Sequence, residues 1–201
     1  MAFPKNGRSD LEKNAKTVGQ TETGNKYKTG AYPLTHPLVD QFRFTRREFM
    51  RSIANVTDKE AERHFGQMNC ISWIIGHLAW HEQRTFLTRP QDIILIPSLN
   101  ELFAFGAPMS TPAFIEMLLT WNTVSKEVDI FLNTITTETL LMDLPNKGRS
   151  VGQTLGSTLQ RITYHYWYHI GEIMSIRQMI GGEHLPDFVG NIDSEAPYRP
   201  E

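Results

Sequence analysis

Cysteine is nearly absent from this 201-residue chain, and long apolar runs and an excess of charge of one sign are absent too. The single cysteine, Cys70, excludes a disulfide framework and any cysteine-based metal cluster. No stretch approaches about 18 uninterrupted apolar residues, and the first residues contain no hydrophobic signal region. We therefore expect a cytoplasmic protein that neither crosses nor binds a membrane.

Acidic and basic side chains nearly cancel. The chain has 20 Lys and Arg residues against 22 Asp and Glu residues, which gives a formal net charge of −2. Nucleic-acid-binding domains usually carry a basic excess on one face, so we expect no nucleic-acid partner. Apolar residues make up 40% of the chain, which can fill the core of one domain and excludes wholesale disorder.

The first 30 residues differ in composition from the rest. They are poor in apolar side chains and rich in Lys, Asn, Gly, Thr and Gln. Because so little apolar surface offsets the entropy of ordering, the sequence predicts a flexible N-terminal arm over residues 1–30. A helical bundle over residues 31–182 and a C-terminal tail over residues 183–201 complete the predicted organisation.

Four long segments show the period of amphipathic helices. The expected helices cover residues 36–55, 69–88, 112–134 and 151–181, and the last begins with Ser150 and Gln153 in capping-box spacing. The link between the second and third is long enough to cross the bundle, so these two helices could run parallel. Only the run Ile93 to Ile96 could pair as a strand. The predicted fold is an all-α four-helix bundle with a long crossover between helices 2 and 3.

Two pairs of histidines, each spaced by four residues, lie on the second and fourth expected helices. They are His77 with His81 and His165 with His169. A four-residue step rotates only about 40° around a helix, so the members of each pair share a face. On the fourth helix this face is the apolar one and also holds Glu172, so these imidazoles should point into the core.

Two histidines and a carboxylate directed into a core are costly unless each polar atom finds a partner. A divalent cation removes that cost, because neutral imidazole is its commonest nitrogen ligand. The alternatives are that the histidines form a polar network within the core, or that their spacing is coincidental and they lie on the surface. On the second helix His77 and His81 both flank the apolar arc, so the period does not choose between them.

Two stretches, ISWIIGHLA at residues 71–79 and the run from Tyr164-His165 to Gly171-Glu172-Ile173, resemble motifs of the DinB-like superfamily, which are metal-binding four-helix bundles. The resemblance spans residues 36–182. It implies His77, His165 and His169 as ligands of one divalent ion, Zn or Ni before Fe or Mn. His81 would be a fourth ligand or a group hydrogen-bonded to a ligand. Many relatives have an Arg after the last histidine and a Gln near it, where this chain has Ile170 and Glu172.

Three imidazoles leave coordination positions for water or a substrate. Several members of the superfamily use a low-molecular-weight bacterial thiol, so the resemblance implies a metal-dependent transferase acting on a small molecule and a thiol cosubstrate. Glu172 would orient a ligand or relay a proton as the catalytic carboxylate. Three alternatives stay open. The protein could be a metal-dependent hydrolase, a non-catalytic bundle that is stabilised by the ion and binds a partner, or a metal-free bundle with an aromatic ligand pocket. Base rates for helical bundles favour a homodimer.

Overall fold

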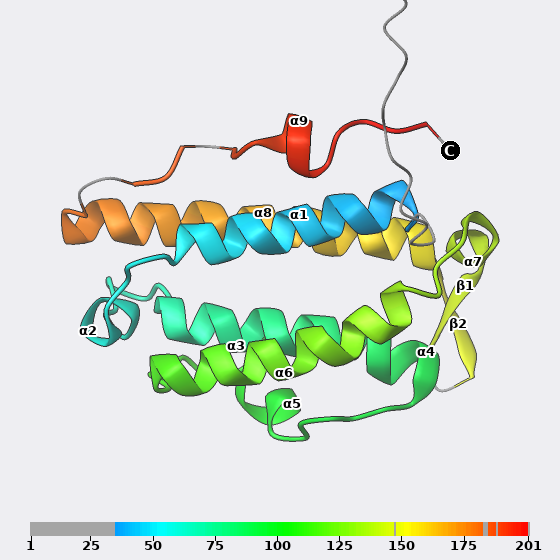
Figure 1. Ribbon diagram of the computed structural model, residues 1–201. Helices are drawn as coiled ribbons and strands as arrows, with labels where there is room; N and C mark the ends of the chain where they lie inside the picture. The colour runs from blue at the N-terminus through cyan, green and yellow to red at the C-terminus, as the bar shows by residue number, and fades with distance from the viewer. Residues whose placement is uncertain (1–34, 147, 183–184, 188, 201) are drawn as a thin grey trace, which may run out of the picture. The chain divides into compact units, whose positions relative to one another are not determined.

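The four expected helices are present in the computed structural model, which describes residues 35–146, 148–182, 185–187 and 189–200. They are α1 (Pro37–Ser52), α3 (Ile71–Glu82), α6 (Phe114–Leu132) and α8 (Leu155–Ile180) (Figure 1). The all-α prediction is confirmed, while the predicted arm over residues 1–30 lies outside the described residues. None of the helices in the described ranges is both long and apolar enough to cross a membrane.

Shorter elements connect the long helices. In chain order they are α2 (Asp58–Ala61), the π-helix η1 (Gln83–Thr88), α4 (Arg89–Gln91), α5 (Leu99–Leu102), α7 (Thr137–Leu141), β1 (Asp143–Asn146), β2 (Arg149–Thr154) and α9 (Ile192–Glu195). The second expected helix is therefore an α-helix that continues into a π-helix and a final short α-helical turn.

The long helices pack as two pairs. Helix α1 lies along α8, α3 lies along α6, and α3 also contacts α8. Figure 1 shows α3 and α6 running in the same direction, with α5 in the connection between them. This parallel arrangement confirms the predicted crossover, and it places residues 92–113 over the outer side of the α3–α6 pair.

A small hairpin replaces the predicted start of the last helix. Strands β1 and β2 pair antiparallel with an irregular register. Thr154 caps α8 by accepting a 3.2 Å hydrogen bond from the Ser157 backbone N–H, so the predicted cap at Ser150 is wrong. Residues 93–96 do not form a strand in the described chain. The hairpin escaped prediction because its strands are short and their alternation is broken by a bulge.

The bundle core contains a buried ion pair. Arg46 Nε donates to Glu82 Oε1 at 2.9 Å, and Arg46 Nη2 makes a second, shorter bond to Glu82 Oε2. The Tyr166 hydroxyl donates to the same carboxylate, as does Ser125 Oγ at 3.3 Å. Glu82 is 0% exposed and Arg46 is 5% exposed. Burial alone would lower the pKa of Arg46, but the charge and hydrogen bonds of Glu82 raise it above its ordinary value, so the guanidinium stays charged.

The described part of the C-terminal tail is fastened to α1. Gln41 Nε2 donates to the Ala196 carbonyl at 2.7 Å, and Arg47 Nε lies 2.6 Å from Glu195 Oε2. Closer to the end of the chain, Arg199 pairs with Asp40. These contacts hold the tail beside the α1–α8 pair (Figure 1).

Removing one partner of the buried ion pair should cost far more stability than removing both. Arg46→Met leaves the Glu82 carboxylate buried without a cation, and we expect the free energy of unfolding to fall by about 3–5 kcal/mol. In Arg46→Met/Glu82→Met no charge is left buried, so the loss should be smaller than in the single variant. Urea unfolding followed by circular dichroism measures both. A loss in Arg46→Met below about 1 kcal/mol would contradict this account.

Candidate metal centre

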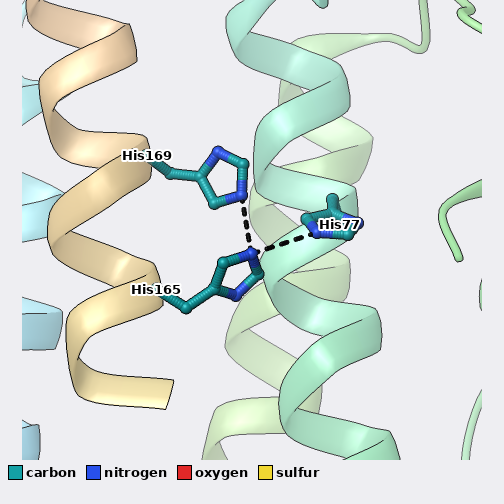
Figure 2. Close-up of side chains that lie close together, drawn as sticks. All are labelled: His77, His165 and His169. Carbon is teal, nitrogen blue, oxygen red and sulfur yellow. Dashed lines mark hydrogen bonds between the residues drawn. The ribbon is translucent and has the colours of Figure 1, made fainter. Parts of the chain in front are cut away.

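Three histidines from two helices point their Nε2 atoms toward one another. His77 comes from α3, and His165 and His169 come from α8 (Figure 2). His165 Nε2 lies 3.3 Å from His77 Nε2 and 2.9 Å from His169 Nε2. Among the described residues, these are the histidines whose nitrogens gather within 4.8 Å of one another. His77 is 6% exposed and His169 is 7% exposed, while His165 is half-buried.

The backbone just after α5 fixes the orientation of His77. The Nδ1 atom of His77 lies 2.7 Å from the Phe103 carbonyl oxygen, which can only accept, so Nδ1 carries the proton and Nε2 has a free lone pair. Gly76 makes this approach possible. A Cβ at Gly76 would lie 2.7 Å from the Phe103 ring and 2.9 Å from Met117 Sδ, closer than any side chain tolerates.

Two tryptophans hold the His77 ring from either side. The Trp73 ring stacks on it at a centroid distance of 5.1 Å, and the Trp80 ring stacks at 5.4 Å. Trp80 is itself held by a 3.1 Å hydrogen bond from its Nε1 to Asn100 Oδ1. The aromatic residues of α3 therefore restrict the rotation of one candidate ligand.

Glu172 lies behind His169 rather than among the Nε2 atoms. Its Oε2 is 2.6 Å from His169 Nδ1, one helix turn away on α8. The neighbouring Tyr168 is 65% exposed, and the charge of Glu172, together with a hydrogen bond to it, raises the pKa of the Tyr168 hydroxyl. Glu172 is thus placed to hold a proton on His169 Nδ1 and leave Nε2 free.

His81 contacts the far side of His165. Its Nδ1 lies 2.7 Å from His165 Nδ1, and the two rings meet edge to face with centroids 4.4 Å apart. His81 stands outside the group of gathered Nε2 atoms. If His165 Nδ1 carries a proton, His81 Nδ1 is its acceptor, which again leaves a lone pair on His165 Nε2.

The donor set fits a divalent ion. The Phe103 carbonyl and the Glu172 carboxylate each accept a hydrogen bond from Nδ1, of His77 and of His169, so in the neutral form of either ring the Nε2 atom can only accept. His165 Nε2 can satisfy one of them with a proton, not both. A cation would satisfy all three. Metal–nitrogen bonds of about 2.1 Å place ligand nitrogens roughly 3.4 Å apart at tetrahedral angles and roughly 3.0 Å apart at right angles, and the separations observed here are 3.3 Å and 2.9 Å.

Burial keeps the rings of His77, His165 and His81 neutral. It lowers the pKa of His77 to about 4, of His165 to about 3 and of His81 to about 2. The charges of neighbouring imidazoles lower these pKa values further, while the Phe103 carbonyl partly opposes the shift at His77. Neutral imidazole is the form that binds metal, so the rings are ready for a cation at neutral pH.

Sequence reasoning missed the polar groups that surround the histidines. Nothing in the sequence indicates the Phe103 carbonyl, because a backbone acceptor can come from any residue. The sequence does indicate the pairing of Glu82 with Arg46 and Tyr166, since Glu82 is a charged residue within a helix that is apolar almost all round. A buried charge of that kind requires a partner on a neighbouring helix.

The metal-free protein should lose stability as the pH falls from about 6.5 toward 4. The pKa values of His77, His165 and His81 in the folded chain lie below the ordinary 6.5, so in this window the unfolded chain binds more protons. Thermal unfolding of the chelator-treated protein should show a melting temperature at least roughly 5 °C lower at pH 5 than at pH 7. His81→Gln should reduce the difference. Equal melting temperatures of the wild-type protein at pH 5 and pH 7 would contradict this prediction.

The comparisons with known proteins agree with this geometry. The sequence profile of the DinB superfamily matches residues 41–173, a range that holds all three gathered histidines, the whole of α3 and most of α8. A comparison with curated proteins finds no matching sequence. Because the matched range covers well over half of the chain, this protein belongs to the DinB superfamily.

Proposed function

We propose that the protein is a metal-dependent enzyme in which His77, His165 and His169 hold one divalent ion, and that it transfers a low-molecular-weight thiol to or from a small-molecule substrate. The observation that carries the proposal is the convergence of three Nε2 atoms whose opposite ring nitrogens are each hydrogen-bonded. Membership of the DinB superfamily supports a metal centre, and the resemblance to its thiol-using members favours a thiol cosubstrate.

The position of His81 favours an open centre over a closed one. A purely structural ion is usually surrounded by four protein ligands, which here would require His81 to join the other three. Its Nδ1 faces His165 Nδ1 instead, on the side away from the gathered Nε2 atoms. Three protein ligands leave room for an external group, as a catalytic centre requires. This favours an enzyme over the metal-stapled interaction module.

When bound, a divalent ion would supply a Lewis acid that favours the deprotonated form of a thiol or of water. The chain's own residues do the rest. Glu172 holds the proton on His169 Nδ1, and the Phe103 carbonyl holds the proton on His77 Nδ1. Tyr168 is exposed beside Glu172, whose charge raises the pKa of the Tyr168 hydroxyl, so this hydroxyl stays protonated and can donate a hydrogen bond at the edge of the centre. Trp73 and Trp80 exclude water around His77.

Hydrolysis is the second reaction compatible with the same residues, because the Lewis acid acts on water as it does on a thiol. Zn and Ni are the ions we favour, with Fe and Mn as alternatives. Three-imidazole centres accept all four, and affinity order alone does not decide occupancy. Location in the cytoplasm and a homodimeric state also stay predictions, which cell fractionation and analytical ultracentrifugation would check.

Untagged wild-type protein should retain about one divalent ion per chain after dialysis, whereas His165→Ala and His169→Ala should retain little. Each substitution removes one of only three ligand nitrogens. Elemental mass spectrometry measures the ion. His64→Ala is the matched control, because His64 lies in the loop before α3 and bonds Met68 and Thr111.

The same variants test the reaction. Transfer of cysteine or another low-molecular-weight thiol to a panel of electrophiles should disappear in His165→Ala and His169→Ala while the helical circular dichroism signal is kept. Turnover at the wild-type level in both variants, or metal content equal to that of His64→Ala, would overturn the proposed function.

Glu172→Ala should weaken metal binding without abolishing it. Loss of a carboxylate that orients a ligating imidazole typically costs roughly 10–100-fold in affinity. Glu172→Gln keeps an oxygen acceptor for His169 Nδ1 and should lose less. Competition with a chromophoric chelator gives both affinities. Unchanged metal affinity in Glu172→Ala would show that Glu172 does not support the metal centre.

A further inference from the structure

Two arginines lie where α3 passes into its π-helical extension. In η1 the backbone N–H of Arg89 bonds to the carbonyl oxygen of Arg84, the five-residue step that defines a π-helix. This step places Arg89 one turn above Arg84 on the same side, whereas an α-helix would turn them apart. Such π-helical turns are rare and frequently occur at functional sites.

Arg84 lies on the same helix face as His77, one of the candidate metal ligands. Its guanidinium carbon lies 5.5 Å from the centre of the Trp80 ring, and that ring stacks on the imidazoles of both His77 and His81. Residues 77, 80 and 84 recur at helical spacing, so one continuous stripe runs from His77 over Trp80 to Arg84. The spacing of seven positions between His77 and Arg84 corresponds to two helix turns, roughly 10 Å along the axis.

The two arginines differ from those of α1 in their partners. In the described part of the chain, no carboxylate pairs with Arg84 or Arg89, although the arginines of α1 pair with Glu82, Asp129, Glu48 and Glu195. The Nε atom of Arg89 is buried and lacks any hydrogen-bond partner. Both side chains are half-buried. Burial lowers the pKa of Arg84, and burial together with the charge of Arg84 lowers the pKa of Arg89.

We propose that Arg84 and Arg89 form a subsite that binds the anionic group, a carboxylate or a phosphate, of a small molecule whose other end reaches the histidine centre. Two adjacent cations without a counter-ion, one with an unsatisfied buried N–H, are stabilised by an anion that they share. The planar guanidinium matches carboxylate and phosphate oxygens in pairs, and Trp80 holds Arg84 in place before the ligand arrives.

The subsite rests on the proposed function, because it assigns a substrate class to the same centre. It would bind the ligand about two helix turns from His77, so the ligand is an elongated acid rather than a compact one. The same cations disfavour a second metal ion near His81, since they add positive charge beside that ring.

Isothermal titration of the metal-loaded protein with succinate and with inorganic phosphate tests the subsite. Wild-type protein should bind at least one of them, and the tighter of the two identifies the anionic group. Arg84→Ala/Arg89→Ala should bind at least roughly tenfold more weakly, because charge-assisted hydrogen bonds are lost. Zinc affinity should stay within about twofold of wild type, since no ligand nitrogen is touched.

Lys126→Ala is the matched control, because it removes one exposed cation from α6 and should leave both affinities unchanged. If the double variant does not fold, the single polar variants Arg84→Gln and Arg89→Gln should each weaken binding at least about threefold. The proposal is overturned by anion affinity equal to wild type in the arginine variants, by an equal loss in Lys126→Ala, or by wild-type protein that binds neither anion.

The two proposals fail separately. Wild-type protein that retains no divalent ion yet binds the anion through Arg84 and Arg89 would preserve the subsite and overturn the metal enzyme. If Arg84→Ala/Arg89→Ala binds both zinc and the anion with wild-type affinity, the metal centre stands and the subsite is overturned.

Discussion

The contact between α3 and α8 depends on two consecutive polar pairs. His81 meets His165, and one residue further along each helix Glu82 meets Tyr166. Each pair contains groups that are costly to bury alone, so neither helix can slide or rotate without leaving a buried donor or acceptor unsatisfied. Arg46 adds the positive charge that Glu82 needs. The polar pairs thus set the helix register in which the other histidines can meet.

The fold could largely be predicted from the sequence, because its signals are periodic and local. Apolar spacing marks the four long helices, and the length of the link after α4 indicates a crossover. The inward direction of His165 and His169 follows from their position on the apolar arc. What periodicity cannot indicate is the π-helical step in η1, since it adds no recognisable residue pattern and displaces everything after it by a fraction of a turn.

The choice of ligands and the proton positions at the candidate metal centre depend on tertiary contacts. His77 and His81 are equivalent by helical period, and only the packing of α3 against α8 makes one face the gathered nitrogens and the other face the back of His165. The proton positions depend on Phe103 and Glu172, of which one acts through its backbone. Such partners determine ligand orientation as strongly as ligand identity does, and they leave little trace in a single sequence.

The hydrogen bond from His77 to Phe103 ties the electronic character of one imidazole to the path of the crossover. A ring that donates strongly through its rear nitrogen is a better electron donor through its front nitrogen. Any molecule that presses on residues 99–107 or pulls them away would therefore alter the Lewis acidity at the histidines without touching them. Since Gly76 admits the Phe103 ring against α3, the absence of one methyl group makes this remote adjustment available.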